Sequence, residues 1–382
     1  MTKPDDSIRK VIDNTVRPRL LDQEKYLAAA GPSPLPVARA DLLYLWDDYR
    51  TEYLDFAALR NPVGHSHPMV AQAVSEHARY YGLTAPQGQH LLRWPVEYAK
   101  QLSACFTGHT EEPRKVLFCE GEREAVIQAV RLASAGKPVA VLDTGWHDWL
   151  PGDTRMVTPT AWSSIEWEGI GALLLAPVTT AAHPILGIRE MILLARTAGV
   201  PVIIDESVTG FGRLGSLWGQ EKTGLIADLT VLGGPLGGGY PLGAVVAPPD
   251  FFTDPIDVSP LSGHPVACSA GKHTLDVISL GVLEYMEDSA AVLNRGLGEL
   301  EAQFPQYLVG HHGEGLLVGL RFQPGYAGRF PLAARAQGLY VSPPVGETIV
   351  LAPVLITSTT EMTRAVDLIA ATLMSWDDGD VT

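Results

Sequence analysis

Short apolar segments alternate with longer amphipathic segments through the middle of this 382-residue chain. Segments that are apolar on both faces and joined by helical crossovers are typical of a parallel sheet covered by helices. The pattern therefore predicts an α/β fold with a mostly parallel central sheet. The strand-like segments are residues 115–121, 138–145, 171–178, 200–207, 229–234 and 243–248.

Two further patterns flank this region. The sequence LYLWDDYRTEYLDF, residues 43–56, alternates around a central turn and predicts a β-hairpin. A helical pattern from Pro265 to Met286 predicts one connector helix leading into a C-terminal α+β part. We therefore predict an N-terminal segment with its hairpin (1–60), a large α/β domain with the connector helix (61–286) and a small α+β domain (287–382).

The charge and cysteine content narrow the classes of partner. A formal net charge of −15 disfavours nucleic acid and anionic membranes as partners, and the sequence has no apolar run long enough to span a bilayer. The first residues, MTKPDDSIRK, lack the apolar core of a signal peptide. Cys105, Cys119 and Cys268 are odd in number and widely spaced, which predicts reduced thiols and no cysteine metal site. We expect a cytoplasmic protein with a small-molecule ligand and no metal.

Chemically useful side chains follow four of the predicted strands. Ligands bind outside the carboxyl ends of the strands in open parallel sheets, so these residues are predicted to surround one pocket. They are Asp205 with Glu206, Glu122 with Arg123, Trp146 with His147, and the glycine-rich loop of VLGGPLGGGYPLGAVVAP, residues 231–248.

Each of these residues also has a purely structural interpretation, which the sequence leaves open. Asp205 would serve equally well as a turn or cap residue, and Trp146 as a packing residue. Glu122 and Arg123 would suit a solvated helix start, where a glutamate interacts favourably with the helix dipole.

The order of the motifs resembles the class III aminotransferases, a fold-type I family that uses pyridoxal phosphate (PLP) and includes ornithine, diaminobutyrate and glutamate-semialdehyde enzymes. The resemblance covers nearly the whole chain. It rests on the hairpin and the following GHSHP turn (64–68), on IIDESVTGFGRLG (203–215), on GGGYPLGAVVA (237–247) and on GHPVACSAG (263–271). It implies a smaller α+β domain formed by the C-terminal part and the N-terminal segment. It also implies a homodimer with the pocket at the interface.

The family's cofactor-binding lysine is missing from this sequence. In the family, a lysine three residues before the glycine run forms the Schiff base with PLP, and here that position is Gly234. The family's small-residue phosphate motif at a helix N-terminus is replaced by EGEREA. Glu122 would repel a dianionic phosphate there, and Arg123 would offset part of that repulsion.

Other family positions have also changed. The phosphate-binding threonine of the neighbouring subunit corresponds to Pro260, the arginine for a substrate carboxylate to Val350, and a glutamine near the ring hydroxyl to Val208. Two positions are retained: Asp205 matches the carboxylate that pairs with the pyridinium nitrogen, and Trp146 matches the aromatic residue stacked on the ring. Parallel losses at several positions favour a changed function over a single lost residue.

Three functions follow as hypotheses. In the first, the pocket runs a lysine-independent reaction on a small polar or anionic metabolite, with Glu122 and His147 for acid–base chemistry and Arg60 and His264 for substrate binding. In the second, PLP or its amine form PMP binds non-covalently to Asp205, Trp146 and Arg123. In the third, the chain is a non-catalytic subunit that pairs with an active paralogue.

Overall fold

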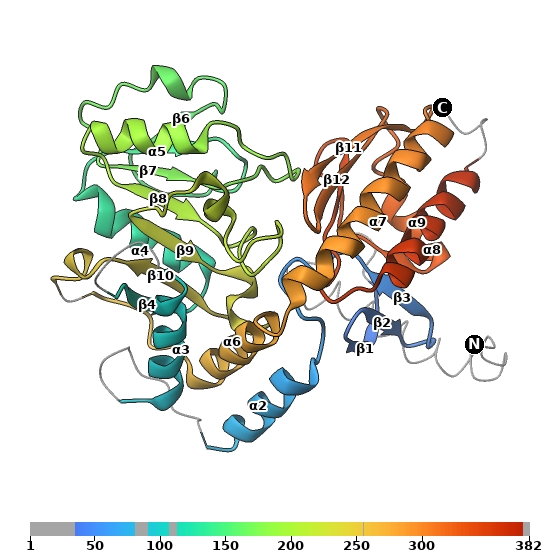
Figure 1. Ribbon diagram of the computed structural model, residues 1–382, viewed down its shortest axis with the longest axis horizontal. Helices are drawn as coiled ribbons and strands as arrows, with labels where there is room; N and C mark the ends of the chain where they lie inside the picture. The colour runs from blue at the N-terminus through green and yellow to red at the C-terminus, as the bar shows by residue number, and fades with distance from the viewer. Residues whose placement is uncertain (1–34, 81–90, 107–112, 255, 377–382) are drawn as a thin grey trace, which may run out of the picture.

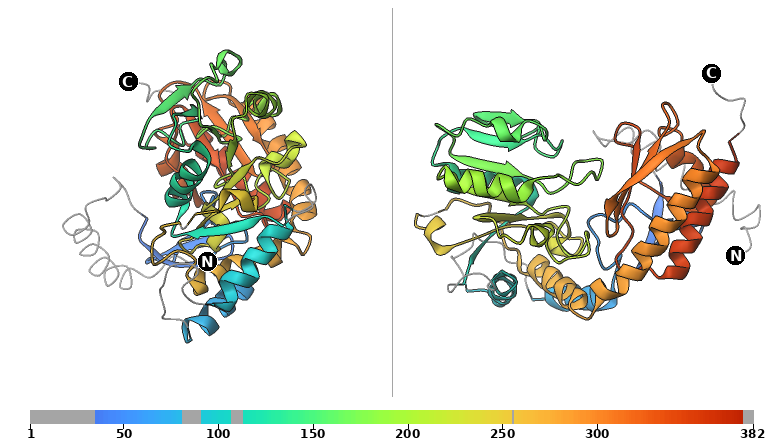
Figure 2. Two further views of the ribbon diagram at one scale, coloured as in Figure 1. Left: turned by 90° about the vertical axis from the view of Figure 1, so that its left-hand side faces the viewer. Right: turned by 45° about the horizontal axis from the view of Figure 1, so that its top comes forward.

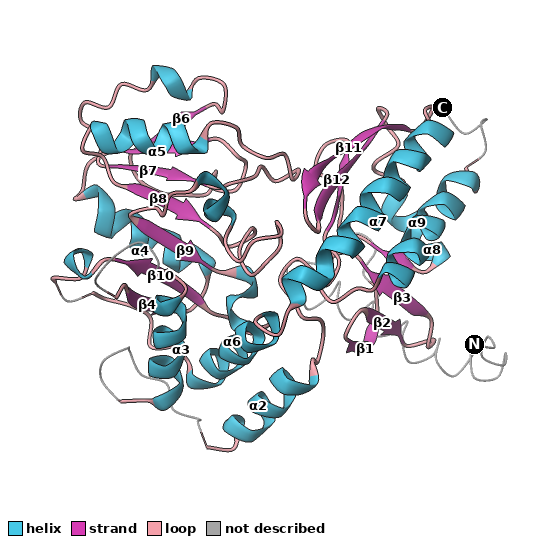
Figure 3. Cartoon of the chain, in the orientation of Figure 1, coloured by secondary structure: helices cyan, strands magenta, loops and turns pink. Residues whose placement is uncertain are grey.

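The computed structural model describes residues 35–80, 91–106, 113–254 and 256–376 (Figures 1 and 3). Its α-helices are α2 (Pro68–Ala78), α3 (Arg93–Ala104), α4 (Glu122–Ser134), α5 (Ile188–Thr197), α6 (Pro265–Ile278), α7 (Val282–Gln303), α8 (Phe330–Gln337) and α9 (Thr359–Met374). Within these ranges the strands form three sheets, of seven, four and three strands.

The seven-stranded sheet has the order β4-β10-β9-β8-β7-β5-β6. The strands from β5 to β9 are parallel, and β10 is antiparallel to both β4 and β9, so the predicted mostly parallel sheet is confirmed. The edge strand β6 was not predicted, because its side chains are largely solvent-facing. The strands are β4 (Lys115–Cys119), β5 (Val139–Leu142), β6 (Thr154–Val157), β7 (Ala172–Leu175), β8 (Val202–Asp205), β9 (Leu229–Leu232) and β10 (Gly243–Ala247).

Alternating side chains of this sheet reach two different cores. Val139 and Val141 of β5 pack in the cluster that contains the buried face of α4. Ala140 and Leu142 pack in the cluster that contains the buried face of α5. Because neighbouring side chains of a strand point to opposite faces, α4 and α5 cover the sheet from its two sides.

The N-terminal hairpin joins the C-terminal part of the chain. The predicted hairpin is confirmed by antiparallel β2 (Tyr44–Asp47) and β3 (Glu52–Asp55), with β1 (Val37–Asp41) beside β2. On its other side β3 pairs in parallel with β13 (Leu339–Tyr340). A third sheet contains β11 (Leu308–Glu314), β12 (Leu317–Phe322) and β14 (Thr348–Leu351), and α7 packs on β11 and α9 (Figure 2). The smaller α+β unit is thus built from both ends of the chain.

The predicted single connector helix is wrong in one respect, because the structure divides it into α6 and α7. The break lies at Ser279–Gly281, where Gly281 has a φ of 96°. This left-handed conformation favours glycine and interrupts helical hydrogen bonding. The two helices run from the large sheet toward the C-terminal unit (Figure 1). The division at residues 60/61 and 286/287 stays a prediction.

The three cysteines are free thiols, with Cys119 and Cys268 buried. Burial raises the pKa of the Cys105 thiol to about 11, so this thiol is protonated at neutral pH. Within the described ranges, no helix has the length and apolar character needed to cross a membrane.

Candidate functional site

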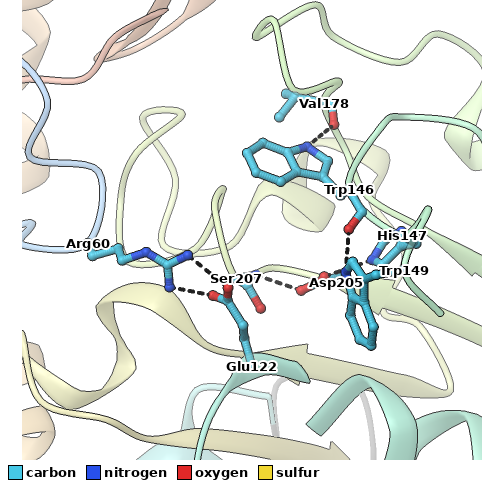
Figure 4. A network of polar contacts seen from close by, with 8 residues as sticks. All are labelled: Arg60, Glu122, Trp146, His147, Trp149, Val178, Asp205 and Ser207. Carbon is cyan, nitrogen blue, oxygen red and sulfur yellow. Dashed lines mark hydrogen bonds and ion pairs between the residues drawn. The ribbon is translucent and has the colours of Figure 1, made fainter. Parts of the chain in front are cut away.

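Residues that follow the carboxyl ends of three strands of the large sheet line one small cavity (Figure 4). Of the residues predicted to surround one pocket, Asp205, Glu122, Arg123 and Trp146 line this cavity, whereas Glu206, His147 and the glycine-rich loop do not. Asp205 ends β8, Trp146 follows β5, and Glu122 begins α4 directly after β4. Arg60 reaches the same cavity from the segment after β3, and Arg123 also lines it. The cavity volume is about 40 Å³.

Asp205 is held from two sides. One carboxylate oxygen, Oδ2, lies 2.9 Å from Nε2 of His147, and the other accepts a hydrogen bond of 2.9 Å from the backbone N–H of Ser207. The side chain of His147 is only 1% exposed and does not line the cavity. Acid–base chemistry by His147 would therefore have to pass through Asp205, so we infer that His147 positions this carboxylate.

Two tryptophans form one wall of the cavity (Figure 4). The indole N–H of Trp146 donates to the carbonyl of Val178 at 3.0 Å, and that of Trp149 donates to the carbonyl of Trp146 at 2.8 Å. These bonds fix the orientation of both rings. The Arg123 guanidinium carbon lies 4.9 Å from the centre of a Trp149 ring, which is cation–π geometry.

An ion pair lies where the resemblance places the lysine. Arg60 donates Nη1–Oε2 and Nη2–Oε1 hydrogen bonds of 2.6 and 2.8 Å to Glu122 (Figure 4). These hydrogen bonds raise the pKa of Arg60. A Cβ atom at Gly234 would lie 3.9 Å from Cγ of Arg60, and one at Gly233 would lie 2.5 Å from Cβ of Glu122. The ion pair is therefore packed against these two glycines.

Gly234 has a conformation that a lysine would adopt only under strain. Its φ is +47°, and a Cβ atom there would lie 2.3 Å from the carbonyl oxygen of Ser207. The glycine begins a short 3-10 helix, η4 (Gly234–Gly237), directly after β9. The loop packs closely on the segment after Asp205, and no side chain at position 234 fits this backbone arrangement.

Carboxylates surround the N-terminus of α4. Glu122 and Glu124 lie in its first turn. The Glu124 carboxylate accepts hydrogen bonds from the backbone N–H groups of Glu120, at 2.6 Å, and of Ser259, at 3.0 Å. Glu120 accepts a hydrogen bond from the Ser259 hydroxyl at 2.6 Å. A helix N-terminus normally favours an anion, but here the protein's own carboxylates supply that negative charge.

These residues fit only part of PLP, the cofactor that the resemblance implies. Asp205 and Trp146 have the chemistry to contact a pyridine ring, but the cavity that they line, at about 40 Å³, is smaller than such a ring. The carboxylates at α4 do not suit its phosphate, and Gly234 has no amine for a Schiff base. None of the described lysines lines the cavity; Lys222 pairs with Glu314, and Lys272 pairs with Asp276 at 2.9 Å. The described residues therefore do not fit a covalently held PLP.

Two further predicted residues lie away from the cavity. His264 is the N-cap residue of α6, where its Nδ1 accepts a hydrogen bond from the backbone N–H of Val266 at 3.3 Å, so the structure does not support its predicted contact with substrate. Glu206 is buried and accepts hydrogen bonds from the backbone N–H groups of Gly219 and Gln220. Burial raises the pKa of Glu206 to about 7. Its carboxylate holds the loop after β8 in place.

Arg213 has a role at the site that the sequence interpretation missed. Its buried guanidinium donates to the carbonyls of Ala58 and Leu59 and, from the C-terminal part, to those of Leu316 and Pro353. Burial lowers its pKa to about 10. Arg213 thus fixes the backbone immediately before Arg60. The motif that contains it was recognised, but only the folded chain brings these carbonyls together.

Comparisons with known proteins agree with this architecture. The family model "Aminotransferase class-III" matches residues 182–373, which is half of the chain. Acetylornithine aminotransferase of Agrobacterium fabrum is 28% identical over 375 residues, covering 86% of this chain and 91% of the relative. The Streptomyces coelicolor enzyme of the same name is 29% identical over 361 residues, covering 85% and 87%. The crystal structure of acetylornithine aminotransferase from Elizabethkingia anophelis superposes with a TM-score of 0.81 at 25% identity, covering 94% of this chain and 99% of that one.

The sheet order and these matches lead to one assignment. This chain belongs to the class III aminotransferase family, whose members are fold-type I, PLP-dependent enzymes.

Proposed function

We propose that this chain does not transaminate through a lysine-bound cofactor and that its cavity serves a lysine-independent function on a small molecule. One observation carries the proposal: the Arg60–Glu122 ion pair is packed against Gly233 and Gly234, at the position of the family's lysine. A bidentate guanidinium–carboxylate pair is a specific, charge-assisted arrangement. The pair would supply the charged groups of a site that works without the lysine.

The ion pair also bears on the charge of the ligand. The sequence favoured a polar or anionic metabolite because Arg60 and Arg123 were available as anion anchors. The guanidinium of Arg60 is engaged by Glu122, and that of Arg123 is stacked on Trp149. The two N–H groups of Arg60 that face Glu122 are occupied, so an anion at this guanidinium would lie next to the Glu122 carboxylate, and Glu122 would have to leave Arg60 to act as a base. These contacts favour a neutral ligand.

Cofactor attachment can be tested on the purified chain. The absorbance spectrum is recorded alone and during titration with PLP and with PMP, followed by borohydride reduction and peptide mass mapping. We expect no absorbance band of a Schiff base and no single modified lysine. The matched control is the Streptomyces coelicolor relative treated identically. Stoichiometric trapping of PLP on one lysine of this chain would overturn the proposal.

A second candidate function is supported by Asp205 and Trp146. Both line the cavity, and His147 and the Ser207 N–H hold the carboxylate in place. A carboxylate beside an indole suits contact with a pyridinium ring that is bound without a covalent bond, and such a ring would also need the space of the cavity that adjoins this one at Trp146 and Val208. The same titration separates the two candidates: saturable PLP or PMP binding that borohydride does not fix, and that Asp205→Asn abolishes, would favour the second.

We also propose a cytoplasmic homodimer with the pocket at its interface, or a heteromer in which the chain supports an active paralogue. The family resemblance supports the homodimer. Purification from the native host followed by mass measurement distinguishes the two assemblies. A pure homodimer with no second chain would contradict the supporting-subunit hypothesis.

A further inference from the structure

A second, larger cavity adjoins the polar one. Its volume is about 180 Å³, more than four times that of the first, and the two share Trp146 and Val208 as lining residues. Leu59, Leu317 and Val350 contribute to its wall, so segments far apart in the sequence meet there. Most of the lining is aliphatic or aromatic.

None of the side chains that line this cavity is charged. The nearby guanidiniums are engaged, because Arg60 is paired with Glu122 and Arg213 with backbone carbonyls. A carboxylate entering the cavity would lose its hydration without gaining an ionic partner, which is costly. The cavity therefore disfavours amino acids and other carboxylates.

Few of the side chains that line the larger cavity carry polar atoms. Thr180 and Ser342 line the cavity, and no side-chain hydrogen bond joins either hydroxyl to another described residue. Thr179 also lines it, but its hydroxyl already accepts a bond of 3.1 Å from the N–H of His183. The indole N–H of Trp146 is used by Val178. Thr180 and Ser342 thus leave hydrogen-bonding capacity for one small polar group.

The size of the cavity limits the ligand further. A dry apolar cavity of about 150 Å³ in a protein binds a molecule as large as benzene. A cavity of about 180 Å³ has room for one aromatic ring and a short substituent. Trp146 supplies an aromatic surface on its wall, which suits a planar ligand.

We propose that this cavity binds a small neutral molecule that has one aromatic ring and one hydroxyl or carbonyl group. The inference rests on the proposed function and deepens it by naming the ligand class, because a lysine-dependent aminotransferase would have to accommodate a charged amino acid here. Binding places the ring in the apolar cavity and the polar group at Thr180 and Ser342.

Benzyl alcohol and benzoate are the probes, because they share a ring and differ in charge. Binding to the cofactor-free full chain is measured by ligand-observed NMR and by Trp fluorescence. We expect saturable binding of benzyl alcohol and at least about tenfold weaker binding of benzoate. Equal or tighter binding of benzoate, or no saturable binding of benzyl alcohol, would overturn the inference.

Substitutions in the cavity wall test whether benzyl alcohol binds in this cavity. Val350→Phe fills the space and should weaken benzyl alcohol binding about tenfold. Val309→Phe, on the exposed side of β11 and with a parent side chain that is 43% exposed, is the matched control and should bind like the parent chain. If Val350→Phe does not fold, Thr180→Val is used, and it should weaken benzyl alcohol binding but leave toluene binding unchanged. Unchanged benzyl alcohol binding in a folded cavity variant would refute this location.

The cofactor titration distinguishes a failure of this inference from a failure of the proposed function. Trapping of PLP on one lysine together with a preference for benzyl alcohol would overturn the proposed function alone. A preference for benzoate without cofactor trapping would overturn the ligand class alone.

Discussion

The Arg60 guanidinium donates hydrogen bonds of 2.6 and 2.8 Å to the two carboxylate oxygens of Glu122. Cγ of Arg60 lies 3.9 Å from the position that a Cβ atom would take at Gly234. The resemblance in sequence aligns this glycine with the lysine of the class III aminotransferases. Beside this position Arg60 and Glu122 form an ion pair whose side chains are 58% and 31% exposed. This relationship makes the site testable by simple substitutions.

Removal of the Glu122 charge should expose Arg60 to external anions. We expect Glu122→Gln to bind inorganic phosphate at least about fivefold more tightly than the parent chain, because one negative charge at the helix N-terminus is removed. Calorimetric titration measures this. Arg60→Gln/Glu122→Gln is the control and should lose the gain. Equal phosphate affinity in the parent chain and in Glu122→Gln would contradict the inference that the Glu122 carboxylate keeps external anions away from Arg60.

The conformation of Gly234 should make it intolerant of any side chain. We expect Gly234→Ala to lower the free energy of unfolding by about 2–4 kcal/mol, since it combines a left-handed φ with a collision against the Ser207 carbonyl. Gly136 also has a positive φ, of +76°, but a Cβ atom there would meet no other atom within 4 Å, so Gly136→Ala isolates the backbone effect. Urea unfolding measures both. Equal losses in the two variants would show that the Ser207 contact does not matter.

Arg213 should be essential for holding the segment after β3 and the C-terminal part of the chain against the loop that follows β8. We expect Arg213→Met to cost about 3–5 kcal/mol, because it leaves buried carbonyl groups without donors. Arg196 also binds a backbone carbonyl but its side chain is 35% exposed, so Arg196→Met should cost about 1 kcal/mol or less. Chemical denaturation compares the two. Similar small losses would mean that water replaces the buried guanidinium.

The free energy of unfolding should fall at acidic pH because two stacked imidazoles become protonated. His183 and His312 lie face to face with ring centres 3.4 Å apart and an interplanar angle of 4°. Burial lowers the pKa of both rings, and the Arg321 charge lowers it further. The His311 and His183 charges also lower the pKa of His312, whereas its bond to the Ala181 carbonyl raises it. As pH falls below about 6.5 the unfolded chain therefore binds more protons, and the free energy of unfolding decreases.

This pH effect is isolated by comparing variants. We expect His183→Gln to lose less stability than the parent chain between neutral pH and pH of about 5, measured by urea unfolding. Glu206 acts in the opposite direction, because its raised pKa lets stability fall as pH rises toward about 7. Its contribution is common to the parent chain and the variant, so it cancels. Identical pH profiles of the two proteins would contradict a role for the stack.

Much of the fold follows from local pattern. Each predicted strand of the large sheet corresponds to an observed strand, because apolar segments with helical crossovers have few other ways to bury both faces. The prediction of a single connector helix was wrong, because the helical periodicity of the sequence continues across Gly281. That periodicity gives no sign of the left-handed φ that this glycine adopts. The edge strand β6 was missed because its polar, exposed residues carry no burial pattern.

Residue type and order along the chain were enough to establish the sheet, the family and the absence of a lysine at position 234. They also placed Asp205, Glu122 and Trp146 at one edge, since parallel strands end together. The three-dimensional packing was needed to show that Arg60 binds Glu122, that His147 lies behind Asp205 and that His264 caps a helix instead of facing the cavity. Arg60 and Glu122 are 62 positions apart in the sequence, and His147 and Asp205 are 58 apart. Such contacts depend on side-chain direction and burial, which are fixed only when the chain is packed.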